Sequence, residues 1–315
     1  MSRRIRGPEE GPRDVLRAVC YPEIVRRLFF LLILVATLVV APAAQTPRKH
    51  FMWAVQKAGT PPTYLLGSLH VLTPDFYPLD TNLERAFSES KVLIEEVDLD
   101  ELTNPVTALS LVGKAMLVDG RTLDQTINPE LYKQVAARAE KAGLPMVAMN
   151  RMKPWMAAVS LAGPALKQAG FDTELGIDKH FFDKAKAASL ERRALETVAY
   201  QFDSLDQLSP ALQEALLKSA ISELDTEVAN VKTIAQAWGR GETSTIERLL
   251  LGTIVDSPEL YERLLVTRNK NWVAPVEKCV EEKTACFVVV GAAHLVGPDS
   301  LVALLKQKGY TVEQQ

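Results

Sequence analysis

The chain has 315 residues, a formal net charge of -3 and 47% hydrophobic residues. This length and apolar content suffice for one large domain or two smaller ones with a well-formed core. The slightly acidic balance argues against a phosphate-binding surface, so nucleic acid is not expected among the partners. No Walker loop, G-x-G-x-x-G, G-x-S-x-G or zinc-ribbon spacing occurs in the sequence, which removes the commonest nucleotide-binding and serine-hydrolase signatures.

The first 44 residues have the pattern of an export signal. An arginine-rich segment precedes the apolar run LFFLLILVATLVV, and the small residues of APAAQ follow it. The run is short for a membrane span, which needs about 20 residues. Residues 1–44 are therefore interpreted as a cleavable signal peptide, with retention as a membrane anchor as the alternative. Cys20 precedes the apolar run and lacks a lipobox context. We expect a periplasmic or secreted protein, with membrane contact only through an uncleaved N-terminal segment.

The part after residue 45 begins with strand patterns. The stretch from Met52 to His70 indicates two strands joined by a turn that contains Gly59 and two prolines. The segment LDTNLERAFSESK has helical spacing and leads into KVLIEEVDL, a compact apolar run that ends in carboxylates. A mainly helical central region is predicted at about 105–250, with LPMVAM as a further short strand inside it.

The C-terminal part begins with a long helical pattern, SPELYERLLVTRNKNWVAPVEKCV. The last stretch, FVVVGAAHLVGPDSLVALLKQKGYTV, then predicts a strand, a loop, a helix and a final strand. Strands that alternate with helices indicate a single α/β domain at 45–315, with a mixed sheet, flanking helices and a helical insertion.

Two cysteines lie close together before the last apolar strand. Cys279 and Cys286 bracket the residues VEEKTA. In an oxidising compartment they are expected to form a disulfide that closes this turn. The alternative is a pair of unrelated thiols.

The most informative pattern is a G-x-x-H sequence that occurs twice after an apolar strand. It places His70 after Leu65 and Leu66, and His294 after the run from Phe287 to Val290. Glycine lets the chain turn sharply and lets the backbone approach a ligand closely. Ligands of α/β sheets gather at the carboxyl ends of the strands, so the two histidines are expected to share one site.

A third strand end supplies carboxylates at Glu95, Glu96 and Asp98. Alternation along a strand puts Glu96 and Asp98 on one side and Glu95 on the other, although a slip of one residue would reverse this assignment. Two imidazoles and a carboxylate are a common donor set for a divalent metal. His70, Glu96 and His294 are therefore the predicted ligands of Mn, Co or Zn, with a metal-activated water as the nucleophile.

Other polar residues are candidates for roles around this site. Arg268, within an apolar helical pattern, is expected to bind a carboxylate or to stabilise an oxyanion, with pairing to one of the strand-end acids as the alternative. Asp178 is a second candidate, with helix capping as the ordinary alternative. Glu196 and Gln201 either face the same crevice or lie on the surface. His180 is expected on a helix face, and His50 is expected to have no role.

The order of these segments resembles the TraB/GumN family, which includes the animal TIKI proteins. The resemblance runs from about Trp53 to Val312 and includes LLGSLHVL, GIDKHFFDKAK, LETVAYQFDSL, RNKNWV and the final VVVGAAHLVGPDS. It implies a fold related to the erythromycin-esterase and ChaN-like proteins and, in the TIKI branch, a metal-dependent protease. Carried over residue by residue, it implies roles for His70, Glu96 and His294, and matches characteristic positions at Asp178, Glu196, Arg268 and Asn269.

Three functions remain open from the sequence. The first is an exported metal-dependent hydrolase, specifically a peptidase acting on a peptide or protein. The second is a protein that binds a metal, haem or peptide without turnover, and the third is a metal-free esterase in which a histidine is the general base.

Overall fold

The computed structural model describes residues 49–222, 224–252 and 254–315. The predicted signal segment at 1–44 and Cys20 lie outside the described residues. Within the described ranges, no helix combines the length and apolar character that a membrane crossing requires.

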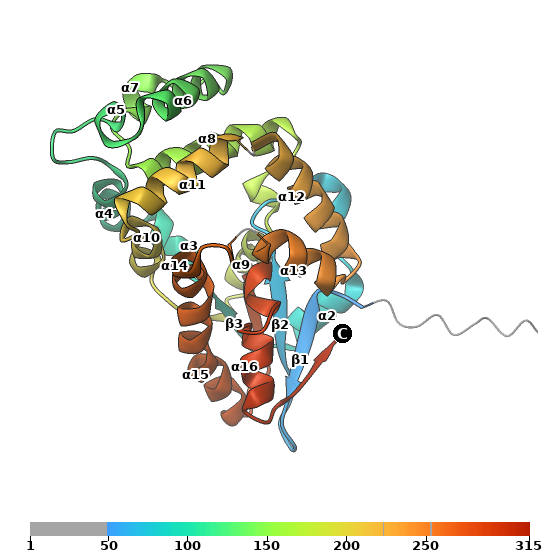
Figure 1. The fold of residues 1–315 in the computed structure, drawn as a ribbon. Helices are drawn as coiled ribbons and strands as arrows, with labels where there is room; N and C mark the ends of the chain where they lie inside the picture. The colour runs from blue at the N-terminus through green and yellow to red at the C-terminus, as the bar shows by residue number, and fades with distance from the viewer. Residues whose placement is uncertain (1–48, 223, 253) are drawn as a thin grey trace, which may run out of the picture. The chain divides into compact units, whose positions relative to one another are not determined.

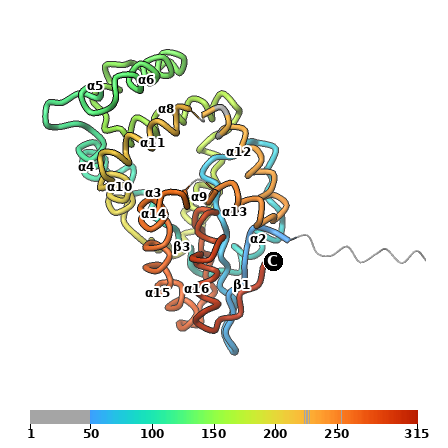
Figure 2. The backbone as a smooth tube through the Cα atoms, in the orientation of Figure 1, coloured from blue at the N-terminus to red at the C-terminus, as the bar shows by residue number. Residues whose placement is uncertain are grey.

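The fold is α/β and is built on a mixed sheet (Figures 1 and 2). The described residues form six strands in the order β4-β3-β5-β2-β1-β6. Their bounds are Met52–Gln56 (β1), Thr63–Ser68 (β2), Val92–Glu95 (β3), Glu191–Ala194 (β4), Cys286–Gly291 (β5) and Thr311–Gln314 (β6). Strands β4, β3, β5 and β2 run parallel, whereas β1 is antiparallel to both of its neighbours.

The central strands are apolar because they are covered on both faces. Phe287, Val288 and Leu65 have no exposed surface, as is typical of parallel strands with helices on each side. The main core joins these strands to residues of the flanking helices, among them Phe181 and Trp272. Their burial fixes the plane of the sheet and therefore the positions of the strand ends.

From β2 onward, each strand is connected to the next through one or more helices. Their bounds are Thr81–Glu89 (α2), Leu99–Thr103 (α3), Pro105–Ala115 (α4), Leu123–Thr126 (α5), Pro129–Lys141 (α6), Met146–Met149 (α7), Pro154–Gln168 (α8), Ile177–Ala187 (α9), Val198–Asp206 (α10), Pro210–Ser222 (α11), Leu224–Gly239 (α12), Thr243–Leu251 (α13), Pro258–Tyr261 (α14), Thr267–Glu281 (α15) and Leu301–Gln307 (α16). Short 3-10 turns occur at Pro74–Phe76, Thr173–Leu175 and Ala292–Leu295. In Figure 1, α15 and α16 lie along the sheet, whereas α8, α11 and α12 lie beyond one end of its strands.

The predicted helical region has a core of its own. Leu123, Val135, Met149, Leu161 and Leu217 pack together in a cluster distinct from the one around the sheet. Strand β4 interrupts the helices of this region and joins the edge of the sheet beside β3.

Two local predictions need correction. The strand expected at LPMVAM is wrong, because Met146–Met149 forms a short helix with Pro145 at its N-cap. The long helix predicted from residue 258 is also not uniform. A π-helical turn at Glu262–Val266 separates α14 from α15, and such a turn changes the direction of the side chains that follow it.

The expected disulfide is present between Cys279 and Cys286. Their Cα atoms are 6.4 Å apart, within the usual range for a bridge. Cys279 belongs to the last turn of α15 and Cys286 begins β5. The bridge therefore holds the end of one helix against the start of the central strand.

Candidate functional site

The candidate site lies at the carboxyl ends of the four parallel strands. Strand β5 stands between β2 and β3, so the residues that follow these three strands are neighbours although they are far apart in sequence. The first G-x-x-H sequence spans the end of β2, Glu95 ends β3 and Glu96 follows it. The second G-x-x-H sequence spans the end of β5 and a 3-10 turn. The structure thus brings His70, Glu96 and His294 to one edge of the sheet.

His70 is oriented by a carboxylate from the start of α9. Its Nδ1 lies 3.1 Å from Asp178 Oδ2, and Ser68 donates a hydrogen bond to Oδ1 of the same carboxylate at 3.0 Å. Asp178 is the main cause of a raised His70 pKa, about 9. Gly176 is the N-cap of α9, so the capping alternative for Asp178 is wrong. Its carboxylate instead fixes the imidazole of His70.

Glu96 is buried in a set of donors. Gly291 donates its backbone N–H to Oε1 at 2.6 Å, while Oε2 accepts from Arg268 at 2.7 Å and from Gln201 at 2.9 Å. Burial alone would raise the pKa of Glu96, but His294 and Arg268 lower it to about 2. The side chain is therefore a carboxylate at neutral pH.

Arg268 connects two strand ends. Its Nε donates to Glu196 at 3.1 Å, its Nη2 donates to both Glu96 and Glu196, and its Nη1 donates to the Leu264 carbonyl and to His294. Arg268 and the carboxylates are almost inaccessible to solvent. A buried guanidinium shared between carboxylates is held in one position. The predicted pairing of Arg268 with a strand-end acid is therefore observed, and Glu196 is buried against Arg268 rather than lying on the surface.

His294 is a buried neutral imidazole whose tautomer follows from its neighbours. Asn269 Nδ2 donates to the Asp299 carbonyl at 2.8 Å, which turns Asn269 Oδ1 toward His294 Nδ1 at 2.7 Å. The proton therefore sits on Nδ1, and Nε2 accepts from Arg268 Nη1 at 3.2 Å. Burial lowers the pKa of His294 to about 3.

Glu95 and Glu96 are adjacent in sequence but differ in protonation state. The alternation argument separated Glu95 from Glu96 and paired Glu96 with Asp98, but β3 ends at Glu95, and Asp98 caps helix α3. Both glutamates line one cavity of about 210 Å³, which His70, Asp178 and Gly291 also line. Burial raises the pKa of Glu95 to about 9, and its buried Oε1 has no hydrogen-bond partner among the described residues. Glu95 is thus a neutral acid in the wall of the site.

The space in front of Gly291 is where the three predicted ligands meet. A Cβ at this residue would lie 3.2 Å from Glu96 Oε1, 3.5 Å from His294 Cδ2 and 3.9 Å from His70 Nε2. Each histidine has an oxygen acceptor at Nδ1, the usual arrangement for imidazoles that bind a metal through Nε2. The donor chemistry fits a divalent cation.

The predicted ligands do not form a complete metal site in this arrangement. Among the described residues, no three His, Cys, Asp or Glu side chains are grouped closely enough to hold a metal ion as they stand. Arg268 is one reason, because its Nη1 donates to the lone pair of His294 Nε2 that a metal would need. Metal binding by this set requires that contact to be released.

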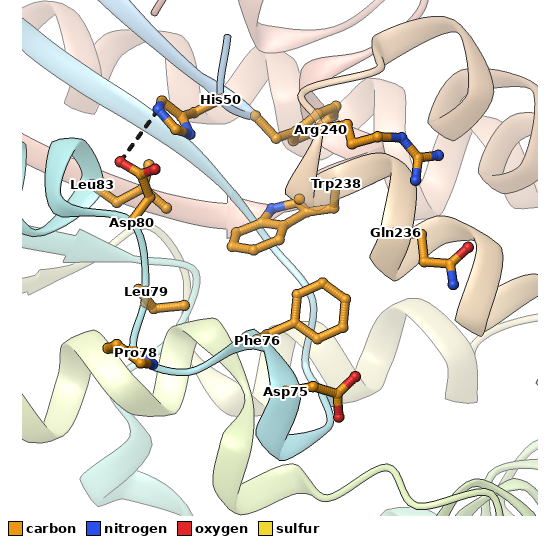
Figure 3. A pocket seen from close by; sticks show the side chains of 12 residues that line it. His50, Asp75, Phe76, Pro78, Leu79, Asp80, Leu83, Gln236, Trp238 and Arg240 are labelled. Atoms are coloured by element: carbon orange, nitrogen blue, oxygen red, sulfur yellow. Dashed lines mark ion pairs between the residues drawn. The ribbon is translucent and has the colours of Figure 1, made fainter. Parts of the chain in front are cut away.

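A larger cavity of about 520 Å³ lies elsewhere, between the start of β1, the Pro74–Phe76 turn and the end of α12. Figure 3 shows Phe76 and Trp238 on its wall, with His50 paired to Asp80. His50 is buried there, which its position near the predicted cleavage site did not suggest. None of the predicted ligands lines this cavity, and we assign the chemistry to the smaller one.

Some neighbours of the site were not predicted. Trp272 packs against His294 with ring centroids 4.4 Å apart and also lies under the Arg268 guanidinium at 4.7 Å. Ser68 lies inside the first G-x-x-H sequence, and the only signal for it was that position. His180 is on α9, as expected, and binds Glu84 at 2.9 Å, outside the site.

A family model described as the TraB/PrgY/gumN family matches residues 51–314. The chain belongs to the TraB/PrgY/gumN family. Both G-x-x-H sequences and the strand-end glutamates fall inside the matched range. The family resemblance expected from the motifs is therefore confirmed.

Named relatives of this family member include both bacterial and animal proteins. The chain is 24% identical to the uncharacterized protein YbaP of Escherichia coli (strain K12), over 82% of this chain and 94% of that protein. It is 24% identical to metalloprotease TIKI1 of Danio rerio, over 85% of this chain and 64% of that protein, and 24% identical to metalloprotease TIKI2 of Xenopus tropicalis, over 86% and 61%. No solved structure matches the chain, so the expected relation to the erythromycin-esterase and ChaN-like fold stays a prediction.

Proposed function

We propose that this chain is an exported metal-dependent peptidase. The observation that carries the proposal is the pair of imidazoles around Gly291, each with Nδ1 held by an oxygen acceptor and each close to Glu96. Similarity to metalloproteases TIKI1 and TIKI2 supports the same reaction class. Export rests on the signal pattern at 1–44 alone.

In this proposal His70, Glu96 and His294 hold the cation, of the Mn, Co or Zn type. A divalent cation bound there supplies Lewis acidity and lowers the pKa of water. Asp178 keeps the His70 ring turned so that Nε2 faces the site, and Asn269 does the same for His294. Because histidine binds metals as a neutral ring, His70 must release the proton that Asp178 stabilises.

Arg268 is proposed to have two functions. It neutralises Glu96 and Glu196, whose charges would otherwise be buried without a partner. When Nη1 no longer donates to His294, that N–H becomes a donor at the edge of the site, while Nη1 keeps its hydrogen bond to the Leu264 carbonyl. A donor at this position stabilises the negative charge that develops on a substrate carbonyl oxygen.

A second candidate is a metal-free hydrolase. The specific observation that favours it is the contact of Arg268 Nη1 with His294 Nε2 at 3.2 Å, which already satisfies that ring. In this case His70, oriented by Asp178, is the general base that takes a proton from water at a pH near or above its pKa of about 9, where the ring is neutral. Stoichiometric capture of a peptide or haem without turnover is the third possibility carried over from the sequence.

The test compares wild type with His70→Ala and His294→Ala, and uses His180→Ala as the matched control. Metal bound per chain is measured by mass spectrometry after reconstitution with manganese, cobalt or zinc, and new termini are measured in a peptide mixture. We expect near-stoichiometric metal and cleavage in wild type and in the control, and loss of both in the two site variants.

The other outcomes separate the candidates. Cleavage that persists with a chelator and without bound metal would replace the metal-dependent mechanism by the His70–Asp178 base. Removal of one peptide per protein chain from solution, with no new termini, would show that the protein sequesters peptides without cleaving them. Unchanged metal and activity in both site variants would remove the assignment of the site.

A further inference from the structure

Helix α4 carries an apolar face that no described residue covers. Val106 is 78% exposed, Leu109 is 74% exposed and Val112 is 52% exposed. Their spacing of three places them on one side of the helix. The opposite side is the buried one, because Leu111 packs against Val198 of α10. Figure 1 shows α4 beside α10. Apolar side chains grouped in this way on a surface mark an interaction site rather than scattered exposure.

This face continues toward the candidate site through helix α3. Leu102, which is 43% exposed, lies near the end of α3 and also lines the 210 Å³ cavity together with His70 and Glu96. Val97 and Leu99 line the same cavity. The cavity therefore has a polar wall that contains two of the predicted ligands, His70 and Glu96, and an apolar wall that includes residues of α3, the helix just before α4. We call Leu102, Val106, Leu109 and Val112 the apolar band.

The charge pattern indicates what binds there. Residues 102–113 contain no Asp, Glu, Lys or Arg, and Lys114, the next residue, is paired with Asp203. A helix that lies on a membrane surface typically carries Lys or Arg on its polar face, which this segment lacks. A stable dimer buries about 800 Å² on each partner, and four side chains on two short helices are a small part of that.

We propose that the apolar band is a docking surface for an uncharged, apolar stretch of a polypeptide substrate. The segment next to the reacting bond enters the cavity beside Leu102, and the chain continues along α4. This inference rests on the proposed function, because it names the substrate class of that site: polypeptides with an exposed apolar segment, as in an unfolded or extended chain. Small polar peptides would lack the contact with α4.

The experiment measures binding separately from cleavage, with the full chain. The probe is fluorescein-labelled lactalbumin, reduced and carboxymethylated so that it stays unfolded, and its affinity is measured by anisotropy. The test variant is Val106→Ser combined with Leu109→Ser. The matched control is Val147→Ser, which changes a valine of α7 that is 79% exposed and belongs to neither the band nor the cavity.

We expect the dissociation constant to rise about tenfold or more in the double variant, the effect typical of lost apolar anchors, and to stay unchanged in the control. Metal affinity and the thermal midpoint should match wild type in both. Weak binding by wild type, or equal binding by the double variant, would overturn the proposal. Two other results would also overturn it. One is a wild-type protein that is a dimer while the double variant is a monomer. The other is binding of phosphatidylcholine–phosphatidylglycerol vesicles by wild type but not by the double variant.

Failure of the proposed function has a different signature. If wild type binds the labelled chain through the band but produces no new termini, the docking surface stands and the peptidase assignment falls. The converse result has two parts: wild type and the double variant cleave short soluble peptides equally well, and neither protein binds the unfolded chain. In that case the peptidase assignment stands and the docking surface is wrong.

Discussion

Gly291→Ala probes the meeting point of the three predicted ligands. The backbone at Gly291 has φ −50° and ψ 137°, a conformation that any residue adopts. The substitution therefore causes no backbone strain. Its effect comes from the added methyl group, 3.2 Å from Glu96 Oε1 and 3.9 Å from His70 Nε2.

The magnitude follows from two opposing effects. Replacing glycine by alanine at a compatible position stabilises by about 0.4–1 kcal/mol through the unfolded chain. Overpacking against Glu96 and His294 costs about 1–3 kcal/mol. The net loss of stability is therefore at most about 2–3 kcal/mol, and the protein stays folded. The methyl group nevertheless fills the space between the donors. We therefore expect the affinity for a divalent cation to fall about 100-fold or more, at least as much as when a residue that orients a metal ligand is lost.

The assay is metal affinity by competition with a chelating dye, together with thermal unfolding of the metal-free protein. Gly113→Ala is the control, because a Cβ there meets nothing within 4 Å and Gly113 lies inside helix α4. It should leave metal affinity unchanged and stabilise by up to about 1 kcal/mol. If Gly291→Ala binds the cation as tightly as wild type, the three donors do not converge in front of Gly291 and the site assignment is wrong.

Three further predictions follow from the same contacts. Asp178→Asn should lower the pKa of His70 from about 9 toward its ordinary value, because the raising charge is removed; an NMR titration of metal-free protein would show this, and an unchanged value would exclude Asp178 as the cause. The pKa of His294 is lowered to about 3, so its contribution to stability is present above the unfolded pKa of about 6.5 and is lost as pH falls toward 3. Chemical denaturation should therefore show a shallower acid dependence in His294→Gln than in wild type. Trp238→Phe should destabilise by about 1–3 kcal/mol because it removes the buried hydrogen bond to the Gly67 carbonyl, and a thermal midpoint equal to that of wild type would contradict this.

The local parts of the fold were predictable from short-range patterns. The strands that end in the two G-x-x-H sequences were identified because an apolar run followed by glycine is a local signal, and so was the Cys279–Cys286 bridge. Prediction failed where two local signals competed. The segment LPMVAM has strand-like residues, but Pro145 at the N-cap and four residues of chain produce a helical turn.

The candidate site was also predicted only in part from local patterns. The alternation argument for Glu95 and Glu96 assumed a strand that extends past both residues, but β3 ends at Glu95. Both side chains consequently reach one cavity, in different protonation states. No sequence pattern carries the length of this strand, because it is limited by its pairing with β4 and β5.

The sequence by itself determined the types of residue at the strand ends, the glycines that let His70 and His294 follow a strand closely, and membership of the TraB/PrgY/gumN family. The tertiary structure decided which of these residues meet. Strand β5 inserts between β2 and β3, and this order places Gly291 against Glu96 across 195 residues of sequence. It also decided that Arg268 shares its donors among Glu96, Glu196 and His294. Such contacts depend on the order of strands in the sheet, which arises from packing of the whole chain and not from any local pattern.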